Sequence, residues 1–205
     1  MYTPKHFEEK DNKILVEFMR HYNFALMISS ENNYPKGTHL PFLIEERGED
    51  IFLVSHMAKA NDQWKSFKNN TILVVFSEPH AYISTSFYGP EDNVPTWNYV
   101  SVHAYGDPVI LETDAEKKRM LEKMIVTFHP PDLKKYKEMN ENYLSKMLKG
   151  IVAFEIKVSD LQGKFKMSQN RNAVEKQNII TEFEKSGDGM KRDVADLIKK
   201  RIKND

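Results

Sequence analysis

Polar and apolar positions alternate with a period of two along two long stretches of the chain, residues 80–88 and 97–105. This period is that of a β-strand, and each stretch gathers rings and hydroxyl groups on one face. Compact apolar runs bounded by turn residues indicate more strands. These further strands are expected at residues 24–30, 38–44, 51–55, 71–76 and 151–158.

Apolar residues at helical spacing separate these strands at several places. Asp11 is placed to cap a helix over 11–22, and Asn61 to cap a short helix that carries Trp64. Thr113 and Glu116 have the spacing of a capping box, and the prolines at 130 and 131 end the helix that follows. Three more helices are expected, one over 132–149 and two charged ones after residue 172, broken at 186–189.

The order of these elements predicts an α+β protein built on antiparallel strands. Six or seven strands precede residue 160, and the helices do not alternate regularly with them, as they would in a parallel sheet. A small antiparallel barrel with attached helices fits this order. We expect one domain over 1–172, with helices inserted at about 113–148, and a helical extension over 173–205. Pro41 donates no hydrogen bond to a sheet, so its strand is predicted to be an edge, to bulge, or to face something other than a strand.

Composition narrows the class of protein. The 205 residues include 30 Lys and Arg against 30 Asp and Glu, which gives no net charge, and direct DNA binding is therefore not expected. There is no cysteine, which excludes disulfides and thiolate metal sites. No apolar run approaches the ~20 residues that span a bilayer. Residues 1–10 are charged and carry no apolar core of a secretory signal, so we expect a cytoplasmic protein without a membrane segment.

No standard catalytic or phosphate-binding motif is present, and the candidate chemistry lies in less specific clusters. Four of the seven histidines, His39, His56, His80 and His103, fall in or beside expected strands, where they are polar residues of a sheet or, alternatively, ligands of a metal. The segments 80–84 and 96–99 combine flat rings with hydrogen-bonding edges, which suits a planar heteroaromatic ligand but also a barrel interior or a dimer face.

Two clusters of polar residues could hold an anion. Lys59 precedes the short helix capped by Asn61, where a cation and the first N–H groups could bind a phosphate. Residues 164–171 form a second cationic and polar cluster after the last expected strand. An ordinary solvent-facing lysine and a solvated loop are the alternatives that the sequence leaves open.

Several short motifs in this order resemble the PaiB family of FMN-binding split-barrel proteins, whose members are described as negative transcriptional regulators or protease synthase and sporulation regulators. The resemblance covers roughly residues 1–180. The matching residues are Met1-Tyr2-Thr3-Pro4, Thr38-His39-Leu40-Pro41-Phe42, His56-Met57-Ala58, Asn61 with Gln63-Trp64, Pro79-His80-Ala81-Tyr82-Ile83-Ser84, Val94-Pro95-Thr96-Trp97-Asn98-Tyr99, Leu148-Lys149-Gly150-Ile151-Val152 and Ser168-Gln169-Asn170-Arg171.

The resemblance implies a six-stranded antiparallel split barrel similar to pyridoxamine 5'-phosphate oxidase, a homodimer with FMN in a groove between the protomers. It implies that the edge of residues 38–41 runs along the isoalloxazine, and that residues 56–61 surround the ribityl phosphate with Lys59 as the cation. Partner-chain contacts would come from residues 97–99, Gln169 and Arg171. The full expected cofactor set is Thr38, His39, Leu40, Pro41, His56, Met57, Ala58, Lys59, Asn61, Trp64, Trp97, Asn98, Tyr99, Gln169 and Arg171.

Two functions follow from the resemblance, a flavin-dependent oxidoreductase and a flavin-linked negative transcriptional regulator. His39 and His80 are the candidates for proton transfer, because imidazole titrates near neutral pH. A split-barrel protein that binds haem or a metal through strand histidines is the alternative.

Overall fold

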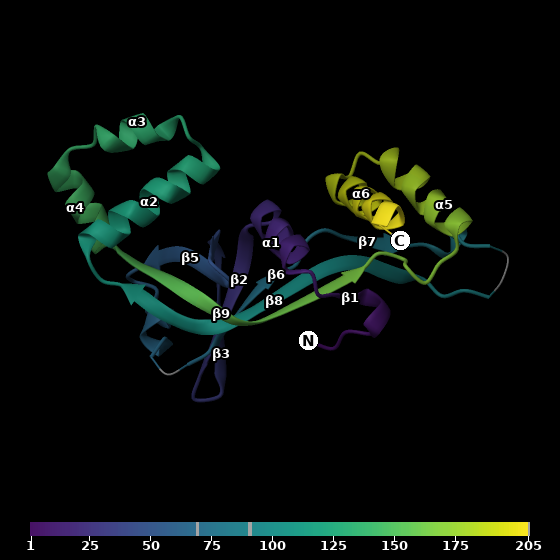
Figure 1. Ribbon diagram of the computed structural model, residues 1–205, viewed down its shortest axis with the longest axis horizontal. Coiled ribbons are helices and arrows are strands. Elements are labelled where there is room, and N and C mark those ends of the chain that lie inside the picture. Colours follow the sequence, from purple (N-terminus) through teal and green to yellow (C-terminus); the bar gives the residue numbers. More distant parts are fainter. Residues whose placement is uncertain (69, 90–91, 205) are drawn as a thin grey trace. The chain divides into compact units, whose positions relative to one another are not determined.

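A computed structural model describes residues 1–68, 70–89 and 92–204 of the chain (Figure 1). The strands are β1 (Glu8–Glu9), β2 (Phe24–Glu31), β3 (Tyr34–Pro41), β4 (Leu43–Arg47), β5 (Asp50–Ala58), β6 (Ile72–Phe76), β7 (His80–Ile83), β8 (Thr96–Leu111) and β9 (Ile151–Lys166). The α-helices are α1 (Asn12–His21), α2 (Asp114–Phe128), α3 (Asp132–Lys137), α4 (Glu141–Lys149), α5 (Ala173–Glu184) and α6 (Gly189–Asn204). Three short 3-10 helices are η1 (Lys5–Phe7), η2 (Asp62–Ser66) and η3 (Thr85–Phe87).

All the described strands belong to one sheet with the order β3-β2-β6-β8-β9-β5-β4, with β1 added beside β9 and β7 beside β8. The α+β class and the antiparallel sheet are confirmed. The described chain has nine strands where six were predicted, and the strand path has two ends, β3 and β4, so the sheet is not closed. No helix of the described chain is long and apolar enough to cross a membrane.

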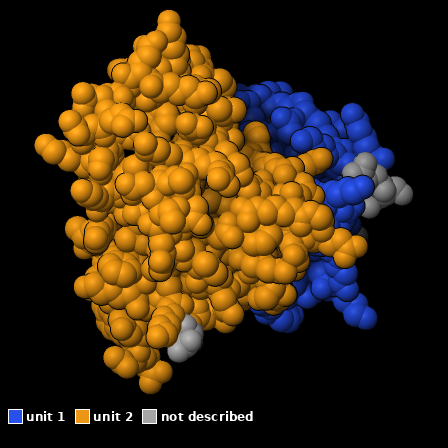
Figure 2. Space-filling view, turned by 60° about the vertical axis from the view of Figure 1, so that its left-hand side comes forward, with its two compact units in different colours: residues 1–15, 77–103, 162–205 blue, residues 16–76, 104–161 orange. Residues whose placement is uncertain are grey.

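The chain forms two compact units, drawn in different colours in Figure 2. Unit 1 comprises residues 1–15, 77–103 and 162–205, and unit 2 comprises 16–76 and 104–161. The long strands β8 and β9 contribute residues to both units. The inserted helices expected at about 113–148 are α2, α3 and α4 of unit 2. The division of the chain at residue 172 stays a prediction.

Unit 2 has a core of aromatic rings beneath its sheet. Phe42 lies 6.1 Å from Phe76 and 6.4 Å from Phe154, and Phe67 lies 5.0 Å from Phe154, all measured between ring centroids in edge-on contacts. Such contacts fix the relative placement of the junction between β3 and β4, the end of η2, β6 and β9 more sharply than area burial alone. A second, smaller cluster joins Tyr136 of α3 to the other two inserted helices.

Unit 1 has its own core, formed largely by the last two helices. Ile179, Ile180 and Phe183 of α5, with Val194 and Ile198 of α6, are at most 3 % exposed. Figure 1 shows α5 and α6 beside each other near β7, which α6 contacts. The break between the helices at 186–189 is confirmed.

Three predicted elements are divided in the structure, each at a side chain or backbone group that offers a competing hydrogen bond. The strand expected over 80–88 ends at Ile83, because the Ser84 hydroxyl accepts from the Ser86 N–H and starts η3. The helix expected over 132–149 is two helices, because Asn140 caps α4. The strand expected over 38–44 is interrupted at Phe42, whose N–H donates to the Asn23 carbonyl oxygen.

Candidate functional site

Strand β3 presents different candidate residues on its two faces. Thr38 is half-buried and Leu40 is 8 % exposed, whereas His39 between them lies on the opposite, exposed face. The His39 ring stacks at 6.2 Å on Phe24, which pairs with Pro41 on the same strand as His39. The structure therefore separates Thr38 from His39, although they are adjacent in the sequence. Because β3 ends the strand order and pairs only with β2 in the described sheet, the prediction that Pro41 lies on an edge strand is confirmed.

A buried amide joins this edge to the short helix η2. Gln63 is 1 % exposed, and its Oε1 accepts a hydrogen bond from the Thr38 hydroxyl at 2.5 Å. Its Nε2 lies within hydrogen-bond distance of the Met27 carbonyl oxygen (3.3 Å), the Ser29 hydroxyl (3.1 Å) and the Lys36 carbonyl oxygen (3.1 Å). Gln63 thus fixes η2 against two strands at once.

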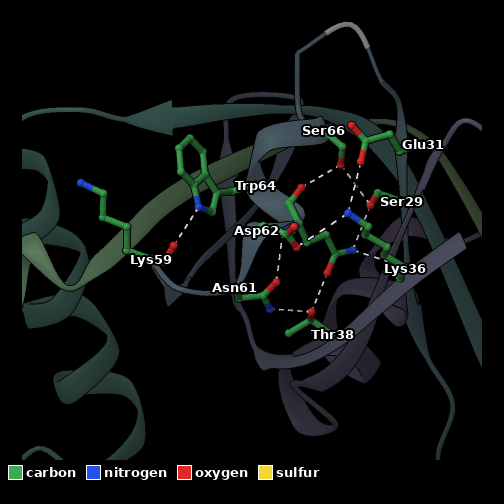
Figure 3. Close-up of polar contacts among 10 residues, drawn as sticks. Ser29, Glu31, Lys36, Thr38, Lys59, Asn61, Asp62, Trp64 and Ser66 are labelled. Carbon is green, nitrogen blue, oxygen red and sulfur yellow. Dashed lines mark hydrogen bonds and ion pairs between the residues drawn. The ribbon is translucent and has the colours of Figure 1, made fainter. Parts of the chain in front are cut away.

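Asn61 completes this connection. Its side-chain oxygen accepts from the Gln63 N–H at 3.1 Å, and its amide nitrogen donates to the Thr38 hydroxyl at 2.9 Å, as Figure 3 shows for Asn61 and Thr38. The predicted capping role of Asn61 is confirmed. Lys36 adds ion pairs to Glu31 (3.2 Å) and Asp62 (3.7 Å), and the hydrogen bond that its ammonium donates to Glu31 raises the pKa of the lysine.

Lys59 is held by its backbone and leaves its ammonium group exposed. Its N–H donates to the Gly150 carbonyl oxygen at 2.8 Å, and its carbonyl oxygen accepts from the Trp64 indole at 3.2 Å. Figure 3 shows the lysine side chain extending away from the network around Thr38. Within the described residues the Lys59 ammonium forms no ion pair. A lysine whose backbone is fixed and whose ammonium group has no ion pair in the described residues can bind an anion.

The end of β5 places three further candidates next to Lys59. Met57 is buried, and Ala58 is exposed. His56 is half-buried, and its Nδ1 has no hydrogen-bond partner in the described residues. Burial lowers the pKa of His56, so the neutral imidazole is favoured. The Ser55 hydroxyl donates to the Pro41 carbonyl oxygen at 2.7 Å and ties this strand to the end of β3.

The aromatic candidates of unit 1 form an exposed cluster on β7 and β8. Trp97 is 51 % exposed and lies opposite Tyr82, with 5.8 Å between the ring centroids. His80, opposite Tyr99, lies 5.9 Å from the Trp97 ring. The alternation predicted over 97–105 is confirmed here, since the rings share one face and Asn98 lies on the other.

Asn98 and Gln169 have side chains engaged within their own chain. Asn98 is fully buried and donates to the Ser168 hydroxyl at 2.8 Å, while its Oδ1 has no partner in the described residues. Gln169 accepts from the Met167 N–H at 2.7 Å and donates to the Phe165 carbonyl oxygen. Ser168 adopts φ 58°, a left-handed conformation that costs free energy in a residue other than glycine.

Arg171 also contacts its own unit. Its Nη1 donates to the Asn93 side-chain oxygen at 2.7 Å and lies 3.9 Å from the Glu175 carboxylate. The guanidinium stands 3.8 Å above the Tyr88 ring, and burial raises the pKa of that phenol. The guanidinium charge is thus already partly compensated, unlike that of Lys59.

The structure gathers Thr38, Asn61, Lys59 and Trp64 around η2, and it places the remaining candidates from residue 80 onwards in unit 1. The sequence analysis missed the central residue of this network, Gln63, which was part of a matching motif but was given no role. Ser29 and Ser66, which is bonded to Ser29 at 3.2 Å, were also missed. A hydroxyl inside the apolar run of 24–30 was the signal that a buried polar partner lay nearby.

The strand histidines show no metal centre in the part of the chain that the structure describes. Among residues 1–68, 70–89 and 92–204, no three His, Asp or Glu side chains are grouped closely enough to hold an ion. These residues therefore hold no preformed set of ligands for a metal ion, and the haem part of the histidine-ligand alternative stays a prediction.

Comparison with known proteins gives one family and several relatives. A family described as "Putative FMN-binding domain" matches residues 1–160. The chain is 36% identical over 207 residues to the protease synthase and sporulation protein PAI 2 of Bacillus subtilis, with 99% of each chain covered.

Two solved structures have a similar fold. The flavocytochrome Anf3 of Azotobacter vinelandii has a TM-score of 0.63 at 15% identity, over 80% of this chain and 72% of the other. An FAD- and haem-binding protein of Mycobacterium smegmatis has a TM-score of 0.62 at 14% identity, over 85% and 80%. At these identities the likeness shows a common fold and does not transfer a ligand.

Proposed function

Because this chain belongs to the FMN-binding domain family matched over residues 1–160, which confirms the resemblance to PaiB proteins, we propose that it is a homodimeric split-barrel flavoprotein. FMN is its cofactor. We infer that the flavin lies in a groove between two protomers, and that each protomer contributes the edge of β3 and the turn around η2.

The residues of unit 2 fit a phosphorylated ring system. Lys59 would bind the phosphate, since its ammonium is exposed and without an ion pair in the described residues. The side chains of Thr38 and Asn61 are hydrogen-bonded to each other at 2.9 Å, so these two residues are already ordered before a ligand binds. The free edge of β3 at 38–41, with Leu40 and Pro41, offers backbone groups to the ring. His56, Met57, Ala58 and Trp64 would line the ribityl side.

The partner protomer would supply residues of unit 1. Trp97 and Tyr99 are proposed to contact the flavin, because the Trp97 ring is about half-exposed on a face of aromatic side chains. We propose that Asn98, Gln169 and Arg171 hold this region in place from the side opposite the flavin. Asn98 is bonded to Ser168, Gln169 to the backbone of 165–167, and Arg171 to Asn93.

The chemistry in this proposal is redox chemistry. Bound FMN supplies hydride and electron transfer, while a protein sets its position, its electronics and what approaches it. His39 and His80 have exposed rings and can donate or accept a proton from a molecule in solution. The first proposed function is therefore an oxidoreductase that uses a soluble electron donor such as NAD(P)H.

A regulatory function is the second candidate, and the 36% identity to PAI 2 of Bacillus subtilis favours it. The absence of net charge argues against direct DNA binding, so a regulator of this type would act through a partner or a metabolite. NAD(P)H oxidation by the FMN-loaded protein and a mobility-shift assay at 150 mM salt separate the two functions. Turnover supports the oxidoreductase, whereas neither turnover nor a shift is the result expected for a regulator that acts through a partner or a metabolite. A sequence-dependent shift would contradict this indirect route.

The free ammonium of Lys59 is the observation that carries the site assignment, and substitution tests it. Lys59→Ala should raise the Kd for FMN about tenfold or more, because a charged hydrogen bond to phosphate is lost. Lys137→Ala, which removes an exposed lysine of α3, is the control and should leave the Kd unchanged. An unchanged Kd in Lys59→Ala, in a protein that still binds FMN, would discard the phosphate assignment but leave the family membership intact.

A further inference from the structure

A groove of about 480 Å³ opens within unit 2, and no residue of the expected cofactor set lines it. It lies between the end of α1, strand β4, and the inserted helices α2 and α3, and its lining includes Arg20, Leu43, Arg119, Lys123 and Val126. A volume of this size is within the range of ~300–1,000 Å³ found for small-molecule sites. No part of the proposed flavin chemistry uses it.

The floor of the groove is apolar. Phe42 is 1 % exposed and Leu43 is 5 % exposed, so both are held firmly by the core beneath. Val126 on α2 is 48 % exposed and lines the groove, with Leu133 of α3 beside it. An aliphatic or aromatic body placed on this floor would cover Val126 and Leu133, which are otherwise partly in contact with water.

Most charges around the groove are already compensated. Arg20 pairs with Glu46 at 2.9 Å and donates from Nε to the Ile44 carbonyl oxygen at 3.3 Å. Lys123 pairs with Glu45 at 2.7 Å. Burial alone would raise the pKa of Glu45, but its hydrogen bonds to Lys123 and Arg47 outweigh burial and lower the pKa. The Glu45 carboxylate is therefore ionised and already paired with these two cations.

Two lining charges have no such partner. Glu122 forms no ion pair in the described residues and is near Tyr136, whose phenol pKa is raised by burial and, to a lesser degree, by this carboxylate. The Arg119 guanidinium forms neither a hydrogen bond nor an ion pair in the described residues, and it attracts the Glu116 carboxylate of the same helix. Because Glu46 and Glu45 compensate Arg20 and Lys123, Arg119 is the lining cation that remains available.

We propose that this groove binds a small organic carboxylate with an apolar body. The carboxylate would accept two parallel hydrogen bonds from the Arg119 guanidinium, a geometry for which arginine is well suited. The apolar body would lie over Phe42, Leu43 and Val126. Glu122 at the rim would disfavour a second negative charge, so the site selects a monocarboxylate over a dicarboxylate.

Octanoate is a suitable probe, because it joins one carboxylate to an unbranched apolar chain. The full-length protein, labelled at its Leu and Val methyl groups, is titrated with octanoate in the presence and absence of added FMN. We expect saturable shifts of the Leu43 and Val126 methyl signals, with or without the flavin. Octylammonium, which has the same chain and the opposite charge, should give no saturable shift.

Two variants and a control test the role of the named residues. Arg119→Gln should weaken octanoate binding about tenfold, the usual size of a lost charged hydrogen bond. Val126→Trp should abolish it by filling the groove, which the remaining Leu43 signals report. Lys135→Gln removes an exposed positive charge on α3 outside the groove and should change the affinity less than twofold.

The proposal is overturned if octanoate gives no saturable shift in the folded wild-type protein. It is equally overturned if octylammonium binds as well as octanoate, or if both Arg119→Gln and Val126→Trp leave the affinity unchanged. Because none of these readouts requires bound FMN, failure of the flavin assignment leaves this test unaffected.

Discussion

Replacing the buried amide of Gln63 should destabilise the fold more than any polar substitution on the surface. Gln63→Met keeps the length of the side chain and removes its hydrogen-bonding groups. The residue is 1 % exposed, so no solvent replaces the lost partners. The substitution therefore isolates the contribution of the amide from that of packing.

The magnitude follows from the number of hydrogen bonds. The amide nitrogen has two hydrogens, and three acceptors lie 3.1–3.3 Å away, so two of them can be bonded at once. The amide oxygen accepts one more bond from Thr38. At about 1 kcal/mol for each bond, the loss amounts to about 3 kcal/mol. Thr38 keeps its bond from Asn61 and Ser29 its bond from Ser66, which limits the further cost of unpaired groups.

Urea denaturation of the wild-type protein and the variant measures this loss. Gln177→Met is the matched control, because the Gln177 side chain is exposed and, among the described residues, bonds only to Thr181 on the same helix. We expect a change within about 0.5 kcal/mol for the control. A decrease in the free energy of unfolding below about 1 kcal/mol in Gln63→Met, at an unchanged denaturant slope, would refute the reasoning that the hydrogen bonds of the Gln63 amide stabilise unit 2.

Two further substitutions test other features of the structure. Burial lowers the pKa of His56 in the folded protein. As the pH falls below about 6.5, the unfolded chain binds a proton that the folded protein does not, so the free energy of unfolding declines. His56→Gln should therefore lose less stability than wild type between pH 7 and pH 5 in urea titrations, and an equal loss would contradict this. A Cβ at Gly106 would lie 2.2 Å from the Lys157 carbonyl oxygen, so Gly106→Ala should lower the free energy of unfolding by about 1–3 kcal/mol. Gly187→Ala is the control, because no atom lies within 4 Å of its added Cβ. Equal thermal midpoints for the two variants would show that β8 at Gly106 does not approach the Lys157 carbonyl oxygen of β9 this closely.

Features with a local cause were predictable from the sequence. The capping box of Thr113 and Glu116 forms as expected, because both of its hydrogen bonds lie within four residues. The turn between β4 and β5 has a similarly local cause, because Gly48 lies at φ 66°, a conformation that glycine adopts without strain. Asn61 likewise caps η2.

The lengths of the central strands could not be read from the sequence. Strand β9 runs from Ile151 to Lys166, whereas the apolar run predicted a strand only to residue 158. Its second half has only two bulky apolar residues, Leu161 and Phe165, and it is held as a strand by its neighbours, which include β1 at Lys164. Pairing of this kind is a tertiary effect and leaves no local signal.

The candidate site was predictable in its segments and not in its connections. The segments around Thr38 and Asn61 were identified, but the bond between these two side chains depends on the meeting of β3 and η2. The alternation of β3 was enough to place Thr38 and His39 on opposite faces. By contrast, Arg119 has no motif around it, and only the groove singles it out.

The central claim is that FMN is bound by a dimer, and the most direct measurement is sedimentation velocity recorded at both a protein and a flavin wavelength. We predict that the flavin absorbance sediments with a particle of two chains, at one FMN for each chain. Flavin that sediments with a single chain, or a dimer that carries none after saturation with FMN, would contradict the account.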